Sequence, residues 1–187
     1  MKYNVCVICD YRGKPKVDPQ TNLSLPVTGP LSGNLVFHLR KYFHAENIEW
    51  FCPKCGKNVN ALSATRIGKA PKVLAIDLKR YYANSNAKCR SFIEVERELN
   101  MSDHLDKPDE ALSPIYRLRA VITHKGEKSD SGHYTTTFLE DDWSVEVDDH
   151  KQELVTDTQF LHTDVCYIMV YENLSVYNKV LLKEVTK

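Results

Sequence analysis

Two C-x-x-C pairs constrain this chain more than any other feature of its sequence. Cys6 and Cys9 form the first pair, and Cys52 and Cys55 form the second. Each C-x-x-C turn presents two thiolates to one ion, and two such turns complete the tetrahedral shell of a structural Zn²⁺ site. Because the pairs are distant in the sequence, the fold must bring two hairpin tips together. The pattern therefore predicts a structural zinc site with no open position for water.

The alternative interpretation of these cysteines is a redox motif or an incidental pair. No thioredoxin-like βαβ pattern surrounds either pair, which favours zinc. The N-terminal segment MKYNVCVICDYRG has no continuous apolar core of the kind that a secretion signal needs. We therefore expect a cytoplasmic or nuclear protein whose cysteines stay reduced rather than forming disulfides.

Two further cysteines stand alone. Cys166 lies in the apolar run VCYIMVY and is expected to be a buried small hydrophobe. Cys89 lies between Lys88 and Arg90, two cations that would lower a thiol pKa, so it is a candidate nucleophile. A nucleophile usually sits at a helix N-terminus or a tight elbow with a base in reach. We therefore favour an exposed strand end for Cys89.

The charge balance limits the kinds of partner. Lys+Arg and Asp+Glu each number 25, so the formal net charge is zero. This balance argues against a nucleic-acid binder driven by a basic field. The most apolar runs, VLAIDL and VCYIMVY, are far too short to cross a bilayer and have the length of strands. We expect neither nucleic acid nor a membrane among the partners.

Most of the chain has strand patterns, as in VLAIDLKRYY, IYRLRAVITHK, HYTTTFLE, WSVEVDD and VCYIMVYEN. Helical periodicity is strong only in SGNLVFHLRKYFHAENI. There Leu35, Leu39 and Phe43 recur every four residues, and Ser32 is a candidate N-cap. Because strands follow strands without regular helices between them, the predicted class is α+β, dominated by antiparallel sheet.

The stretch DSGHYTTTF places His133 where a polar loop enters a strand. Gly132 before it has no side chain, which would let a substrate backbone come close. The next strand, WSVEVDD, ends in Asp148 and Asp149, and a hairpin would return that end beside His133. An aspartate there can accept from the imidazole Nδ1–H, fix the tautomer and stabilise the imidazolium. From these residues alone, a catalytic His–Asp pair and a structural pair both stay open.

The order of these motifs resembles the C-terminal part of the catalytic domain of ubiquitin-specific proteases, which are cysteine-type deubiquitinases. The resemblance covers residues 1–173 and rests on FCPKC, PKVLAIDLKRY, HKG followed by SGHY, and the terminal YIMVYE. Each motif alone is weak, but their order and spacing together are specific.

This resemblance implies a papain-like fold shaped as a hand, in which fingers, palm and thumb hold ubiquitin. Residues 1–66 then match zinc-bearing fingers, residues 67–173 match the palm, and residues 174–187 form a tail. The loop Lys125 to Ser131 matches a mobile loop that covers the ubiquitin tail. The implied partners are ubiquitin and ubiquitinated proteins.

The resemblance also assigns roles to the acid–base residues. His133 matches the family's general base, Asp148 the third triad residue, and Asp149 the acid that often follows it. The spacing from Trp143 to Asp148 is one residue longer than the family's W-x-x-F-D pattern. We therefore expect a β-bulge in this strand, and the choice between the two aspartates stays open.

A larger difference from the family is that one of its motifs is missing. The family's Gly-Asn-Thr-Cys box, which carries the nucleophile and begins a thumb helix, does not occur in this sequence. We expect the thumb to be missing and these 187 residues alone to be inactive, with a separate thumb half as a candidate partner. The alternative is a catalytically dead ubiquitin-binding or scaffold module.

Overall fold

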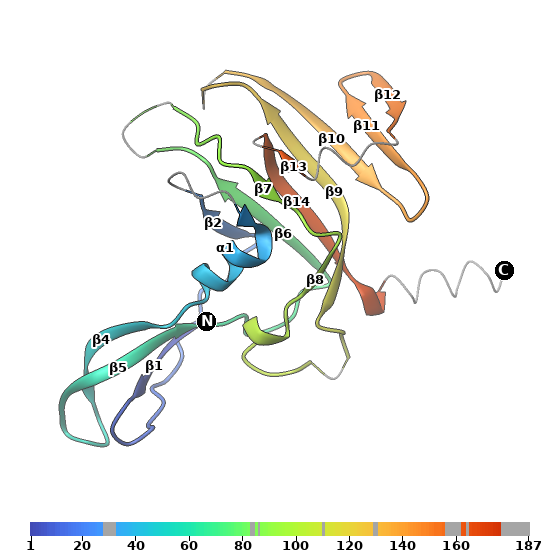
Figure 1. Ribbon diagram of the computed structural model, residues 1–187. Coiled ribbons are helices and arrows are strands. Elements are labelled where there is room, and N and C mark those ends of the chain that lie inside the picture. The colour runs from blue at the N-terminus through green and yellow to red at the C-terminus, as the bar shows by residue number, and fades with distance from the viewer. Residues whose placement is uncertain are drawn as a thin grey trace.

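A computed structural model describes residues 1–27, 33–82, 85, 87–109, 111–128, 131–155, 162–163 and 165–176. Its strands form a small sheet that projects from a larger one (Figure 1). Within the described residues, no helix combines the length and the apolar character needed to cross a bilayer. The predicted α+β class, dominated by antiparallel pairing, is confirmed.

The small sheet has the order β1-β5-β4, with both pairs antiparallel. Its strands are β1 (Lys2–Cys6), β5 (Lys57–Thr65) and β4 (Glu46–Cys52). β1 and β4 both end in a cysteine of a C-x-x-C pair. The two turns that follow therefore lie at the same end of the sheet, as the sequence predicts.

The larger sheet has the order β12-β11-β10-β9-β14-β6-β2, and β8 also pairs with β9. All its pairs are antiparallel except β2 with β6. Its strands are β12 (Lys151–Leu154), β11 (Ser144–Asp148), β10 (His133–Leu139), β9 (Ile115–Lys125), β14 (Cys166–Asn173), β6 (Val73–Lys79), β2 (Leu23–Pro26) and β8 (Glu98–Asn100).

A third sheet consists of short strands, β13 (His162–Thr163), β7 (Ile93–Glu94) and β3 (Gly33–Asn34), and a single 3-10 turn, η1, covers Ser102–His104.

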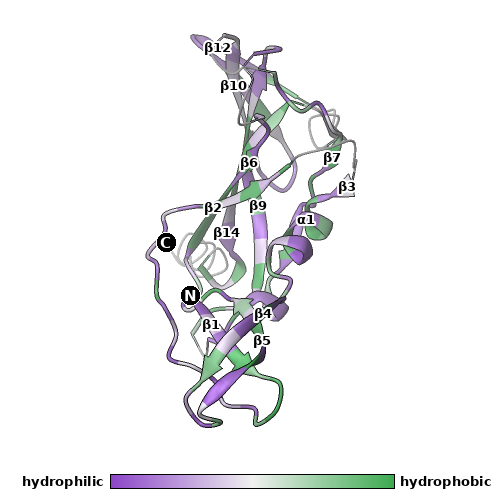
Figure 2. Ribbon diagram, turned by 90° about the vertical axis from the view of Figure 1, so that its left-hand side faces the viewer, coloured by the Kyte–Doolittle hydropathy of each residue, from purple (hydrophilic) through white to green (hydrophobic). Residues whose placement is uncertain are grey.

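The α-helix α1 covers Leu35–Tyr42 and is shorter than the periodic pattern. It stops because Glu46–Cys52 enters β4 of the small sheet. The N-cap is Asn34, whose side chain accepts from the Phe37 N–H at 2.9 Å, whereas the expected cap, Ser32, lies outside the described residues. Seen from the side, α1 covers one face of the larger sheet (Figure 2).

The main core lies between α1 and the larger sheet. Leu23 and Leu25 of β2 and Leu35 and Leu39 of α1 join it, although they come between the first two strands of the small sheet in the chain. Sheet membership therefore does not follow chain order. β2 and α1 belong to the larger core, and the small sheet has its own minor cluster around its cysteines.

A bulge in β9 decides which of its side chains face the core. β9 pairs with β10, the strand that begins at His133. The register with β14 shifts between Val170, opposite Ala120, and Tyr171, opposite Leu118. Leu118 and Val121 consequently both face the core, although they are three residues apart. Strict alternation would have placed them on opposite faces. After the bulge, Thr123 faces inward and pairs with Thr135 of β10 through a 2.8 Å hydroxyl contact.

Candidate active site and metal centre

The four paired cysteines converge at the tip of the small sheet. Their sulfurs all lie within 4.8 Å of one another. The Cys6 and Cys55 sulfurs are 3.9 Å apart, and those of Cys9 and Cys52 are 3.6 Å apart. Zn–S bonds of about 2.3 Å at tetrahedral angles place neighbouring sulfurs about 3.8 Å apart. The cluster therefore already has the dimensions of a zinc–thiolate shell.

Both C-x-x-C turns are closed by the same kind of backbone hydrogen bond. The N–H of Asp10 donates to the Cys6 carbonyl at 3.0 Å, and the N–H of Gly56 donates to the Cys52 carbonyl at 2.9 Å. Each residue follows the second cysteine of its pair and has a positive φ, 55° at Asp10 and 66° at Gly56. Glycine adopts this conformation readily and aspartate is among the few other residues that do, so both sequences suit the same turn.

The proton affinities of these thiols fit a shared cation. Burial raises the pKa of Cys6, but N–H donation by Ile8 and the neighbouring cysteines outweighs it and brings the pKa to about 7. Contact with Cys9, together with burial, raises the pKa of Cys55 to about 12. The set cannot ionise fully alone, because each thiolate opposes the next. A divalent ion removes that repulsion, so the donor set fits zinc.

The β10–β11 hairpin brings His133 and Asp148 together. Thr136 pairs with Val147 and Leu139 pairs with Ser144, so the end of β11 returns beside the start of β10. The His133 Nε2 and Asp148 Oδ1 atoms are 2.5 Å apart, and the two side chains are 45% and 42% exposed. The pairing predicted from sequence is thus present, and both side chains are partly open to solvent.

Two details differ from the expectation. The register between β10 and β11 is continuous from Thr136 to Leu139, so the expected bulge is absent from this strand pair. The ring nitrogen that meets Asp148 is Nε2, not the expected Nδ1. Because an ionised carboxylate only accepts, Nε2 carries a proton in this contact, which in the neutral tautomer leaves the lone pair on Nδ1. The contact with His133 also lowers the pKa of Asp148, so this carboxyl is ionised near neutral pH.

Asp149 lies beside this pair. It starts the two-residue turn between β11 and β12 and has a φ of 52°. One carboxylate oxygen each from Asp148 and Asp149 and one ring nitrogen of His133 lie within 4.8 Å of one another. All three residues singled out from sequence therefore meet at one point. Asp148 is the aspartate that makes the hydrogen bond.

A charged pair borders the His133–Asp148 contact. Lys125 lies opposite His133 in the β9–β10 pair, and its ammonium is 3.1 Å from Glu146 of β11. Lys125 and Lys151 both contribute to lowering the pKa of Asp148. These neighbours reinforce the ionised state of the carboxylate.

Sequence reasoning missed His124, which is 1% exposed and lies under the start of β10. Its ring is 4.6 Å from that of Tyr134, and the Tyr81 hydroxyl is 3.4 Å from its Nδ1. Burial, aided by Lys88, lowers its pKa, so the ring is neutral near pH 7. The missed signal is the histidine of the HKG motif, a polar residue at the end of the apolar run AVI.

The buried ring of His124 also explains why residue 132 is a glycine. A Cβ at Gly132 would lie 2.3 Å from the His124 Nε2. The glycine before His133 therefore makes room for a buried ring of the same chain, whereas the expected reason was the approach of a substrate backbone.

The two isolated cysteines are both inaccessible. Cys166 is fully buried in β14, as expected, and burial raises its pKa to about 12. Cys89 is only 3% exposed, which corrects the expectation of an exposed strand end. The fully buried Arg80 donates to the Cys89 and Ser91 carbonyls and holds this segment inward. Neither thiol can meet a protein substrate.

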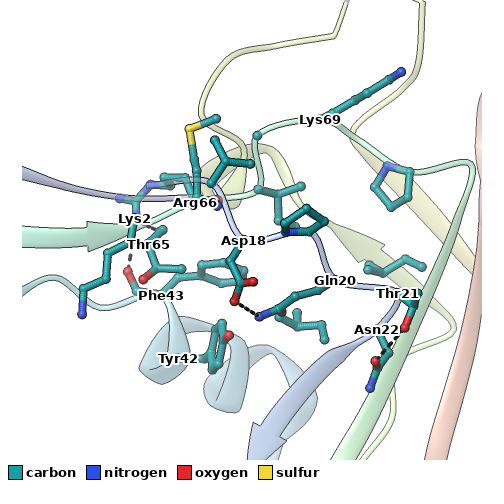
Figure 3. Close-up of a pocket in the computed structure, with 18 of the residues that line it drawn as sticks. Lys2, Asp18, Gln20, Thr21, Asn22, Tyr42, Phe43, Thr65, Arg66 and Lys69 are labelled. Carbon is teal, nitrogen blue, oxygen red and sulfur yellow. Dashed lines mark hydrogen bonds between the residues drawn. The ribbon is translucent and has the colours of Figure 1, made fainter. Parts of the chain in front are cut away.

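A cavity of about 690 Å³ lies away from both sites, where the small sheet joins the larger one (Figure 3). Its lining comes from segments 16–23 and 65–69, the start of β6, the end of α1 and the first two residues. Gln20 donates to Asp18 at 3.2 Å on its wall. None of the cysteine-cluster or His133-site residues lines it.

The sequence matches a known family over most of its length. Residues 2–171 match the family model described as ubiquitin carboxyl-terminal hydrolase. The chain belongs to this family. The resemblance inferred from the motifs is therefore confirmed.

Curated relatives agree with this assignment. The chain is 32% identical to human ubiquitin carboxyl-terminal hydrolase 3 over 152 residues, covering 70% of this chain and 29% of that protein. It is 30% identical to Arabidopsis thaliana ubiquitin carboxyl-terminal hydrolase 25, covering 69% of this chain and 20% of that protein. The chain thus spans less than a third of the length of these two relatives.

A solved structure shares the fold. The chain superposes with a TM-score of 0.78 and 25% identity on a chain of the SAGA Ubp8/Sgf11/Sus1/Sgf73 DUB module bound to ubiquitin aldehyde. The match covers 92% of this chain and 40% of that one. The structural match therefore extends over nearly all of this chain and over less than half of the other one.

Proposed function

We propose that this chain is the fingers-and-palm part of a ubiquitin-specific thiol protease, which hydrolyses the peptide or isopeptide bond after the C-terminal glycine of ubiquitin. His133 is the general base, Asp148 orients it, and Asp149 supports the same site. The observation that carries this proposal is the 2.5 Å contact between His133 and Asp148 in a chain of this family.

The geometry suits the acid–base role. Asp148 accepts from Nε2–H, so the lone pair on Nδ1 is available to take a thiol proton. The imidazolium that forms is stabilised by the adjacent carboxylate, and it later protonates the leaving lysine amine. The side chain of His133 is half exposed, so an incoming thiol and a peptide can both approach it.

The nucleophile comes from outside this chain in our proposal. Four cysteines form the sulfur cluster, and the other two, Cys89 and Cys166, are buried. A thumb segment with the family's cysteine box would supply the thiol and the donors for the oxyanion. These 187 residues alone would then be inactive.

We assign residues 1–66 to the fingers, 67–173 to the palm and 174–187 to a tail, with β2 and α1 packing on the palm. Cys6, Cys9, Cys52 and Cys55 would hold a structural zinc ion, which stabilises the tip of the fingers and takes no part in the reaction. Ubiquitin and ubiquitinated proteins are the proposed partners. A SAGA DUB-module relative was solved bound to ubiquitin aldehyde. The proposed location is the cytoplasm or nucleus.

Coexpression with a cysteine-bearing thumb segment from a family member tests the proposal. We expect the reconstituted pair to cleave a fluorogenic C-terminal conjugate of ubiquitin, and His133→Gln to abolish cleavage while leaving the zinc content unchanged. His150→Gln is the matched control, since His150 is an exposed histidine in the adjacent turn. Cleavage that persists in His133→Gln would refute the role of His133.

A catalytically dead ubiquitin-binding module is the second candidate, because neither cysteine outside the sulfur cluster is accessible. Calorimetry of this chain with free ubiquitin, combined with the reconstitution, separates the two. Binding without cleavage under any reconstitution condition favours the module. Cleavage on addition of the thumb segment favours the protease.

A further inference from the structure

We propose that His133, Asp148 and Asp149 form a second metal site, exposed and separate from the cysteine cluster, that takes a divalent transition-metal ion such as Zn²⁺. The site itself follows from the positions of these three side chains. Its consequence, reversible inhibition, rests on the proposed function, because it assumes that His133 is the general base.

The spacing of the donors is close to what an ion needs. One donor atom from each residue lies within 4.8 Å of the other two. Bonds of about 2.0–2.2 Å to nitrogen and oxygen require donors about 3–3.5 Å apart. The farthest donors must therefore close by roughly an ångström, and the His133–Asp148 contact must open from 2.5 Å. Both side chains are nearly half exposed, so small χ rotations suffice.

The backbone explains how two consecutive aspartates reach one imidazole. In a regular strand, Asp148 and Asp149 would point to opposite faces of the sheet. Asp149 instead has a φ of 52° and begins the turn into β12, which interrupts this alternation. Its carboxylate can then lie on the same side as that of Asp148, where the three donors converge.

The chemistry of the donors selects the class of ion. An imidazole with two carboxylates suits borderline divalent ions such as Zn²⁺, whereas Mg²⁺ and Ca²⁺ favour shells of oxygen alone. The two carboxylates offset the charge of the ion. Lys125 and Lys151 both act on Asp148, and the Lys125 ammonium is 3.1 Å from Glu146, which partly offsets its charge. The sulfur cluster offers four thiolates and fills first, so the new site is the weaker of the two.

An ion at this site would disable the base. If Nε2, the nitrogen that now meets Asp148, bound the ion, its proton would have to move to Nδ1. Nδ1 then has no lone pair to accept a thiol proton, and Asp148 is bound to the ion rather than to the ring. Free zinc would thereby inhibit the enzyme at a position distinct from its structural zinc.

Titration of the zinc-loaded chain with additional Zn²⁺ tests the site. The chain is first loaded with one equivalent of zinc, and calorimetry is combined with NMR detection of the histidine ring signals. We expect a second binding event that shifts the His133 ring signals. Asp149→Asn should weaken this event by about tenfold or more, since changes even to outer-shell partners cost 10–100-fold. His133→Gln should abolish it.

Asp149→Asn is a conservative variant because asparagine tolerates a positive φ. Asp142→Asn is its matched control, since Asp142 is an exposed aspartate in the turn at the other end of the same hairpin. His150→Gln controls for the neighbouring histidine. We expect both controls to bind the second ion as the unmodified chain does.

Three results would overturn the proposal: no second event, an Asp149→Asn variant that binds like the unmodified chain, or loss of binding in His150→Gln. The measurement needs neither substrate nor nucleophile. A negative result therefore refutes the metal site and leaves the proposed protease function standing. A second ion that leaves cleavage by the reconstituted enzyme unaffected refutes the inhibitory consequence.

Discussion

Replacing Gly132 with alanine tests how the site is built. An added Cβ at this position would lie 2.3 Å from His124 Nε2, 2.9 Å from His124 Cε1 and 2.9 Å from the Lys125 carbonyl oxygen. Unstrained carbon–nitrogen contacts are about 3.5 Å or longer, so the ring or the backbone must move by roughly 1 Å. His124 has little freedom to do so, because it is buried against Tyr134.

The cost follows from this overlap. Overpacking in a filled interior costs about 1–3 kcal/mol. The overlap involves both a ring and a main-chain carbonyl, so we expect about 2 kcal/mol for Gly132→Ala. For a chain of this size, that corresponds to a decrease in Tm of about 4–8 °C. Much of the strain should appear at the neighbouring His133.

Urea unfolding at fixed zinc concentration measures the loss in the free energy of unfolding. A double-mutant cycle with His124→Ala assigns its cause, because removing the ring relieves the contacts with Nε2 and Cε1. We expect the combined variant to be more stable than the sum of the two single changes predicts, by about 1 kcal/mol. A loss below about 0.5 kcal/mol for Gly132→Ala, or strictly additive effects, would refute this account.

Three further outcomes follow from the same geometry. After dialysis to remove weakly bound ions, elemental analysis should find one zinc per chain. Cys52→Ser should remove this ion and expose the amides of β1, β4 and β5 to hydrogen exchange; retention of this tightly bound metal would refute the four-cysteine site. Contact with His133 holds the pKa of Asp148 below its ordinary value of 3.8. The contact should therefore stabilise the fold above about pH 3.8, and this stabilisation should be lost as the pH falls through the lowered pKa. Carboxyl NMR can follow the titration of Asp148, and a pKa at or above 3.8 would contradict the prediction. Asn34→Ala should destabilise the fold by about 1 kcal/mol in urea unfolding, because the Phe37 N–H loses its acceptor; no change would exclude a capping role.

Part of the site could be predicted from local patterns. C-x-x-C spacing, strand alternation and a hairpin between HYTTTFLE and WSVEVDD are properties of short segments. These local patterns were enough to predict that the four sulfurs lie together and that His133 lies beside Asp148. The hairpin prediction succeeded because antiparallel register returns one strand end to the start of the other.

Other features depend on contacts between distant segments, which local patterns do not encode. The inward position of Cys89 depends on Arg80, whose guanidinium reaches carbonyls from separate parts of the chain. The packing of α1 on the larger sheet depends on the parallel pairing of β2 with β6.

The sequence by itself determined which residues meet, because periodicity and turn chemistry act over a few neighbours. The tertiary structure decided how they meet. Nε2 rather than Nδ1 faces Asp148, Gly132 makes room for His124, and the turn at Asp149 adds a second carboxylate. Side-chain rotation and close packing are settled only when separate strands share one surface. The orientation of the proposed base is therefore a property of the assembled sheet.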